Sequence, residues 1–161
     1  MTRLTVCVGV ACAALVGVVA GVATSGAQAP GPPTGALEVV LRERDASFKF
    51  VDNPPRRKES AGDMAVISGR LRGTDGSARG RLQAYFVATK GGNFERAFRG
   101  QVSGTLMLPD GDIVLGGVTD DRREEEPLAI AGGTGAYAGA RGIALVTDTQ
   151  SSTRFRLTFM P

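Results

Sequence analysis

The sequence contains no histidine, and both of its cysteines, Cys7 and Cys12, lie close to the N-terminus. The lack of histidine excludes a Ser-His-Asp triad, a histidine-ligated zinc site and the usual general base of neutral pH. Acid–base chemistry in this protein must therefore use Asp, Glu, Lys or Tyr. Asp110 and Asp112 flank a glycine, but two carboxylates fall far short of the roughly six to eight oxygens that hold calcium. We expect no metal and no cofactor.

Aromatic residues are also scarce, at 6% of the chain, and there is no tryptophan. Proteins that bind single-stranded nucleic acids stack bases on aromatic rings, and so few rings give such a surface little support. The net charge of +3 is small and the two signs are mixed along the chain, so no polyanionic partner is indicated. We predict no nucleic-acid partner.

Residues 1–29 have the layout of a secretory signal peptide. Arg3 precedes an uncharged apolar run over residues 4–23, and small residues follow it. Residues 30–36 then form a spacer rich in proline and glycine. This layout predicts a secreted, extracellular protein whose mature domain, residues 37–161, contains no cysteine and therefore no disulfide. The apolar run is long for a signal peptide, so the alternative is an uncleaved membrane anchor, and only then do we expect membrane contact.

From residue 37 onward, short runs of β-forming residues alternate with turn signals, and no segment has helical periodicity. Turn-forming sequences such as Pro109-Asp110-Gly111 join successive strands into an up-and-down antiparallel sheet. A sheet of about eight strands commonly closes, because closure removes its exposed edges. We therefore predict an all-β domain that forms a small closed antiparallel barrel. The candidate strands span residues 37–42, 47–52, 64–72, 79–89, 94–108, 112–119, 128–131, 142–147 and 153–159.

Residues 128–142, LAIAGGTGAYAGARG, allow two opposite interpretations. An apolar run before Gly132, Gly133 and Gly135 resembles the phosphate-binding turn of a dinucleotide-binding fold. Such a turn must open a helix within a βαβ unit, whereas residues 153–159 alternate apolar and polar side chains as a strand does. We therefore interpret the glycines as a tight crossing between antiparallel strands.

Residues 120–126, DDRREEE, break the β pattern and are followed by Pro127. A dense run of charge is typical of a solvated loop, with a binding site as the alternative. We predict an exposed loop here, in which ion pairs contribute little.

Several landmarks occur in order along the mature chain. They are Asp52-Asn53-Pro54-Pro55, Ser60-Ala61-Gly62-Asp63, Gly80-Arg81, Gly104-Thr105-Leu106, Leu108-Pro109-Asp110-Gly111 and residues 128–142. Over residues 37–159 they resemble the allene oxide cyclase and dirigent barrel superfamily, especially its secreted bacterial members. The resemblance implies an eight-stranded antiparallel barrel with a largely apolar lumen, and a homotrimer or other homo-oligomer, as in plant relatives. Members of this superfamily position a reactive ligand, either a fatty-acid epoxide that cyclises or phenoxy radicals that couple.

The catalytic residues of plant allene oxide cyclases are missing from the matching positions. At these matching positions the chain has Val40, Arg42, either Tyr85 or Phe86, and either Val118 or Thr119. The resemblance therefore implies no plant-type cyclase activity.

Two residues match the dirigent pattern: Asp52, before the prolines, and Arg141 of the Ala-Arg-Gly motif. The resemblance makes both candidate catalytic residues, with Asp52 orienting a phenol or acting as a base and Arg141 stabilising developing negative charge. The alternative is that both satisfy loop carbonyls and amides at one end of the barrel. Asp63, which follows a glycine at a strand entrance, is expected to cap the turn.

Tyr85, Phe86 and Phe98 are candidate ligand-binding residues of the lumen, with core packing as the alternative. Three hypotheses for function follow. The first is an exported barrel that binds a small apolar or phenolic molecule, with catalysis left open. The second is a cyclase or isomerase of an unidentified metabolite, which buried carboxylates would favour. The third is a structural envelope protein with a lumen filled by side chains, which a cavity would exclude.

Overall fold

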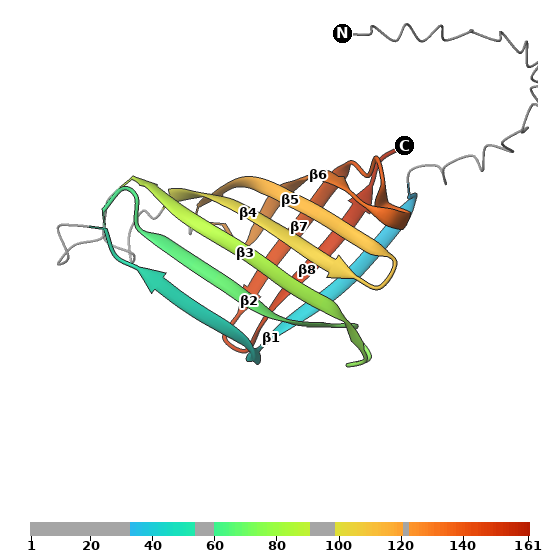
Figure 1. The fold of residues 1–161 in the computed structure, drawn as a ribbon, viewed down its shortest axis with the longest axis horizontal. Helices are drawn as coiled ribbons and strands as arrows, with labels where there is room; N and C mark the ends of the chain where they lie inside the picture. Colours follow the sequence, from blue (N-terminus) through green and yellow to red (C-terminus); the bar gives the residue numbers. More distant parts are fainter. Residues whose placement is uncertain (1–32, 54–59, 91–98, 121–122) are drawn as a thin grey trace, which may run out of the picture.

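The structure, a computed structural model, describes residues 33–53, 60–90, 99–120 and 123–161. They form eight β-strands, and each strand is antiparallel to its neighbours around a closed barrel (Figure 1). The strands are β1 (Gly35–Val51), β2 (Met64–Arg72), β3 (Ala78–Lys90), β4 (Arg99–Leu108), β5 (Gly111–Asp120), β6 (Glu125–Gly133), β7 (Gly142–Thr149) and β8 (Ser152–Phe159). Pairing of β1 with β8 closes the ring. The predicted all-β, closed antiparallel barrel is confirmed.

The signal peptide predicted at the N-terminus lies within residues 1–32, which are outside the described part of the chain. Export therefore stays a prediction. Within the described ranges, no helix has the length and apolar character needed to cross a membrane. The first strand begins at Gly35, two residues before the predicted start of the domain.

One long strand, β1, replaces the two short strands predicted between residues 37 and 52. The predicted break is a β-bulge, where the register with β2 shifts between Leu41 and Ala46. At the bulge, the Asp45 carboxylate accepts two hydrogen bonds from the Arg72 guanidinium, with Nε–Oδ2 at 2.6 Å and Nη2–Oδ1 at 3.2 Å. These bonds lower the pKa of Asp45. The strand bends at this point, so its first half pairs with β8 and its second half pairs mainly with β2.

The predicted charged loop also differs from the structure, because β6 begins at Glu125 and already includes Glu126 and Pro127. Glu126 lies on the same face of β6 as Leu128 and Ile130, which are both buried. Pairing between β5 and β6 begins only at Ala129, so the missing N–H of Pro127 breaks no ladder bond on that side. The series of inward-facing positions therefore continues to Glu126, and β6 includes the charged residues Glu125 and Glu126.

The glycine-rich segment is the crossing predicted from the sequence. A short 3-10 turn, η1 (Gly135–Tyr137), joins antiparallel β6 and β7, which excludes a dinucleotide-binding βαβ unit. Gly135 has φ +58°, and a Cβ atom on it would lie 2.3 Å from the Asp110 carbonyl oxygen. The Ala136 N–H donates to that same carbonyl at 2.8 Å. The crossing thus packs closely on the turn between β4 and β5.

Candidate functional site

The up-and-down strand order gives the barrel two distinct ends. One end, here called the closed end, carries the starts of β1, β3, β5 and β7 and the finishes of the other four strands. The opposite end, here called the open end, carries the loops that follow β1, β3, β5 and β7. Figure 1 shows the closed end on the right, near the C-terminus, and the open end on the left.

Side chains fill the lumen at the closed end. Val39, Leu71, Leu106, Ile113 and Leu157 point inward there, and each is 0% exposed. The crossing segment then covers this end: the Tyr137 ring stacks on Phe159 with centroids 6.0 Å apart, and burial raises the pKa of Tyr137. No ligand can enter from this side without unpacking the core.

The open end holds a cavity of about 280 Å³, lined by residues of all eight strands. Its walls are mainly apolar, with Ile67, Leu82 and Leu128 among the lining residues. The space exists because some inward positions carry small residues, such as Ala84 and Gly104. A largely apolar cavity with a few polar groups is the usual form of a small-molecule site.

The mouth of this cavity has one polar side and one apolar side. The polar side consists of Thr119, Glu126, Asp148 and Thr153, which come from β5, β6, β7 and β8 in turn. The half-buried Glu126 carboxylate accepts a hydrogen bond from the Thr119 hydroxyl and a second, 2.7 Å long, from the Asp120 main-chain N–H. Phe48 belongs to the apolar side and is 64% exposed, since β1 projects beyond its pairing with β8.

None of these four polar residues is among the site residues predicted from the sequence. The run of charge predicts a solvated loop at Glu126, whereas the spacing of Glu126, Leu128 and Ile130 at every second position indicates one inward face of a strand. Asp148 likewise lies on the same face of β7 as Ala144 and Val146. Extending each inward pattern to the end of its strand would have placed both acids at the lumen.

Of the three aromatic candidates, Phe86 lines the cavity and is buried. Its ring lies over Gly100 of β4, where an added Cβ would come within 2.0 Å of Phe86 Cζ. Tyr85 is corrected to the outer surface, where it is 48% exposed, because successive residues of a strand face opposite sides. Phe98 lies outside the described residues.

Asp52 and Arg141 lie at opposite ends of the barrel. Asp52 is exposed and follows β1 at the open end, whereas Arg141 precedes β7 at the closed end. The 17 residues of β1 separate the two ends, roughly 50 Å along the strand. Arg141 donates to the Pro161 main-chain carbonyl oxygen, with Nε at 2.9 Å, which is the alternative role predicted for it. The two side chains cannot act on one reacting centre.

Asp63 anchors the loop at the open end, as its expected capping role requires. The side chain is 1% exposed, and its carboxylate accepts hydrogen bonds from the main-chain N–H groups of Ser60 and Asn53, both at 2.8 Å. The Ser60 hydroxyl adds a third bond at 3.0 Å. The N–H bonds, first that from Ser60, hold the pKa of Asp63 below its usual value. Asp63 is therefore a structural carboxylate, and it is not among the residues that line the cavity.

Comparison with known proteins identifies the fold. No protein-family model matches the chain, and no curated protein matches it. Among solved structures, a pyocyanin demethylase superposes with a TM-score of 0.67 at 21% identity, over 78% of this chain and 100% of that chain. A heme-binding cyclase that catalyses a [4 + 2] cycloaddition in neoabyssomicin biosynthesis gives 0.60 at 17%, over 80% and 66%. The Diels-Alderase AbmU from Streptomyces koyangensis gives 0.58 at 19%, over 80% and 70%. The chain therefore shares its barrel fold with these enzymes.

Proposed function

We propose that this protein binds a small, largely apolar or phenolic molecule in the lumen of an allene oxide cyclase- or dirigent-like barrel, through the open end. The observation that carries the proposal is the cavity of about 280 Å³, walled mainly by apolar side chains and bounded by a packed closed end. Burial of an apolar ligand in such a space removes apolar surface from water, which favours binding. A structural protein with a completely filled lumen does not agree with this cavity.

A second candidate is a cyclase or isomerase that positions its substrate in the same space. Glu126 favours it, because this carboxylate is half-buried and lines the cavity. A carboxylate in that place can accept a proton from a bound molecule or orient a hydroxyl group. The fold neighbours named above as a demethylase and as cycloaddition catalysts lend this candidate support by analogy.

Native mass spectrometry of the protein as it is secreted from its own host tests lumen binding. We expect a reproducible small-molecule adduct that is released on denaturation. The variant Ala84→Phe fills the cavity from the inward face of β3 and should abolish the adduct. Gln83→Phe places the same ring on the outer face and serves as the matched control, since Gln83 neighbours Ala84 but lines no part of this cavity.

A bare protein under all conditions, or an adduct that survives in Ala84→Phe, contradicts lumen binding. The same spectra give the assembly mass, which tests the homo-oligomer that the family resemblance implies. N-terminal sequencing of the secreted chain tests whether residues 1–29 are removed on export. A full-length N-terminus would instead support the membrane-anchored alternative.

A further inference from the structure

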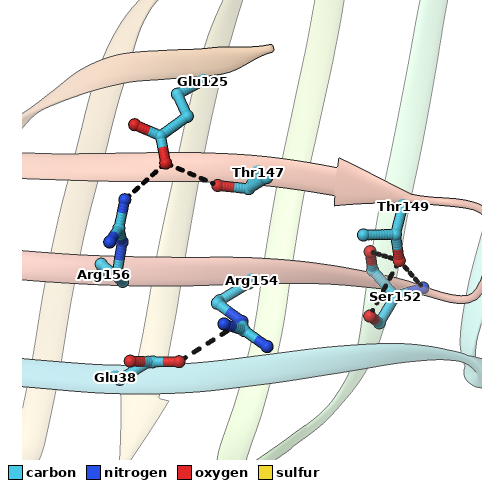
Figure 2. Close-up of polar contacts among 7 residues, drawn as sticks. All are labelled: Glu38, Glu125, Thr147, Thr149, Ser152, Arg154 and Arg156. Carbon is cyan, nitrogen blue, oxygen red and sulfur yellow. Dashed lines mark hydrogen bonds and ion pairs between the residues drawn. The ribbon is translucent and has the colours of Figure 1, made fainter.

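Carboxylates on the outer surface of β1 and β6 are paired with arginines of β8. Figure 2 shows Arg154 bonded to Glu38 and Arg156 bonded to Glu125, with the Thr147 hydroxyl donating to Glu125 at 3.4 Å. The Arg154 Nε–Glu38 Oε1 distance is 3.3 Å. Negative charge on this outer wall is therefore balanced within the protein.

The two carboxylates that face the lumen, Glu126 and Asp148, have no such balance. Among the described residues neither forms an ion pair, and none of the side chains that line the cavity is basic. Glu126 pairs directly with Val146 across β6 and β7, so Asp148, two residues further along, is its diagonal neighbour. Diagonal neighbours on one face of a sheet are roughly 7–8 Å apart, and their Cβ atoms are somewhat closer.

Two carboxylates that form no ion pair within the described residues, beside an apolar space, define the charge of a suitable ligand. A cation at the mouth would lie between two like-charged groups and reduce their mutual repulsion, whereas an anion would be repelled by both. The rest of such a ligand would contact apolar walls, such as Phe86 and Leu128, where an added charge is costly to bury.

We propose that the lumen selects apolar molecules that carry one positively charged nitrogen, with the apolar body inside the barrel and the nitrogen at the mouth between Glu126 and Asp148. This inference rests on the lumen binding proposed above and specifies its ligand class. The Thr119 and Thr153 hydroxyls beside the two acids supply further oxygen acceptors for the N–H groups of a primary amine.

Three probes of matched shape test the inference: 2-naphthylmethylamine, 2-naphthylmethanol and 2-naphthoic acid, each titrated into the full secreted chain by calorimetry at pH 7. The ammonium probe should bind at least tenfold more tightly than the alcohol, and the acid should bind most weakly. Raising the salt concentration should narrow these differences, because screening weakens the charge contribution alone.

The paired variant Glu126→Gln/Asp148→Asn should remove the preference for the amine while the alcohol still binds. Glu125→Gln is the matched control, because it removes an adjacent carboxylate that points outward and is paired with Arg156. Equal binding of amine and alcohol to the unaltered chain overturns the charge selectivity and leaves lumen binding intact. Failure of all three probes to bind overturns both proposals, and neither result depends on whether a variant folds.

Discussion

The two ends of the barrel are built from the same eight strands but differ in what their inward residues do. At the closed end these residues are large and aliphatic, such as Leu106 and Leu157, and they fill the lumen. Further along the same strands, the inward positions carry Gly104 on β4 and Thr153 on β8, and a cavity remains. The backbone ladder continues through both ends, so the size of the inward side chains decides where the barrel is solid and where it is hollow.

The ends also differ in how they are held together. Apolar packing and the Tyr137–Phe159 stack seal the closed end. At the open end, polar contacts also hold the structure, with Asp63 binding the loop before β2 and Glu126 bonded to Thr119. The closed end therefore supplies stability, and the open end can hold polar groups in a hollow site.

Matched truncations in the two ends give the largest expected effect. Leu157→Ala removes a fully buried side chain of the closed end and should lower the free energy of unfolding by about 3–5 kcal/mol. Leu82→Ala enlarges an existing cavity, where packing is already incomplete, and should lower it by about 2 kcal/mol. Urea denaturation measures both. Equal losses would show that the cavity wall is as tightly packed as the closed end.

Gly100→Ala should have the next largest effect, about 1–3 kcal/mol of lost stability. The new methyl group would overlap the Phe86 ring and push it from its place over β4. Because Phe86 lines the cavity, lumen binding should weaken as well. Gly116→Ala on β5 is the control, since an added Cβ there meets only the Val102 carbonyl oxygen, at 3.9 Å. Similar melting temperatures for the two variants would contradict this account.

Asp63→Asn should lower the melting temperature by a smaller amount, and only above acid pH. The folded-state pKa of Asp63 is below the usual 3.8, so the carboxylate stabilises the fold above that pH. This stabilisation is lost as the pH falls through the lower folded-state pKa. Thermal melts of both proteins from pH 7 to pH 2 should therefore converge at the acid end. A constant difference across this range would show that Asp63 acts through packing instead of charge.

The outer ion pairs should matter least. Glu38→Gln breaks the exposed pair with Arg154 and should change the free energy of unfolding by less than about 1 kcal/mol. The melting temperature should respond little to added salt in either protein. A larger loss would mean that the pair holds β1 to β8 and contributes to barrel closure.

Much of the fold could be predicted from local patterns. The β2 strand has the predicted bounds, and alternation on β8 placed Phe155 and Leu157 inward. The predicted bounds of β1 and β6 are wrong for the same reason: residues typical of turns and charged loops, which usually mark the end of a strand, lie here within the strand. On β1 a bulge absorbs the irregularity, and on β6 the inward pattern continues through Glu126. The candidate site was harder to predict, because its four polar residues come from four strands.

The sequence alone determined which residues of each strand share a face, because side-chain alternation is a local property of extended backbone. It also determined the absence of histidine chemistry. Only the tertiary structure decided which residues of different strands meet. Strand register and ring closure bring Glu126 beside Asp148 at one mouth, and they place Asp52 and Arg141 at opposite ends. Register depends on pairing between distant segments, and no short stretch of sequence encodes that pairing.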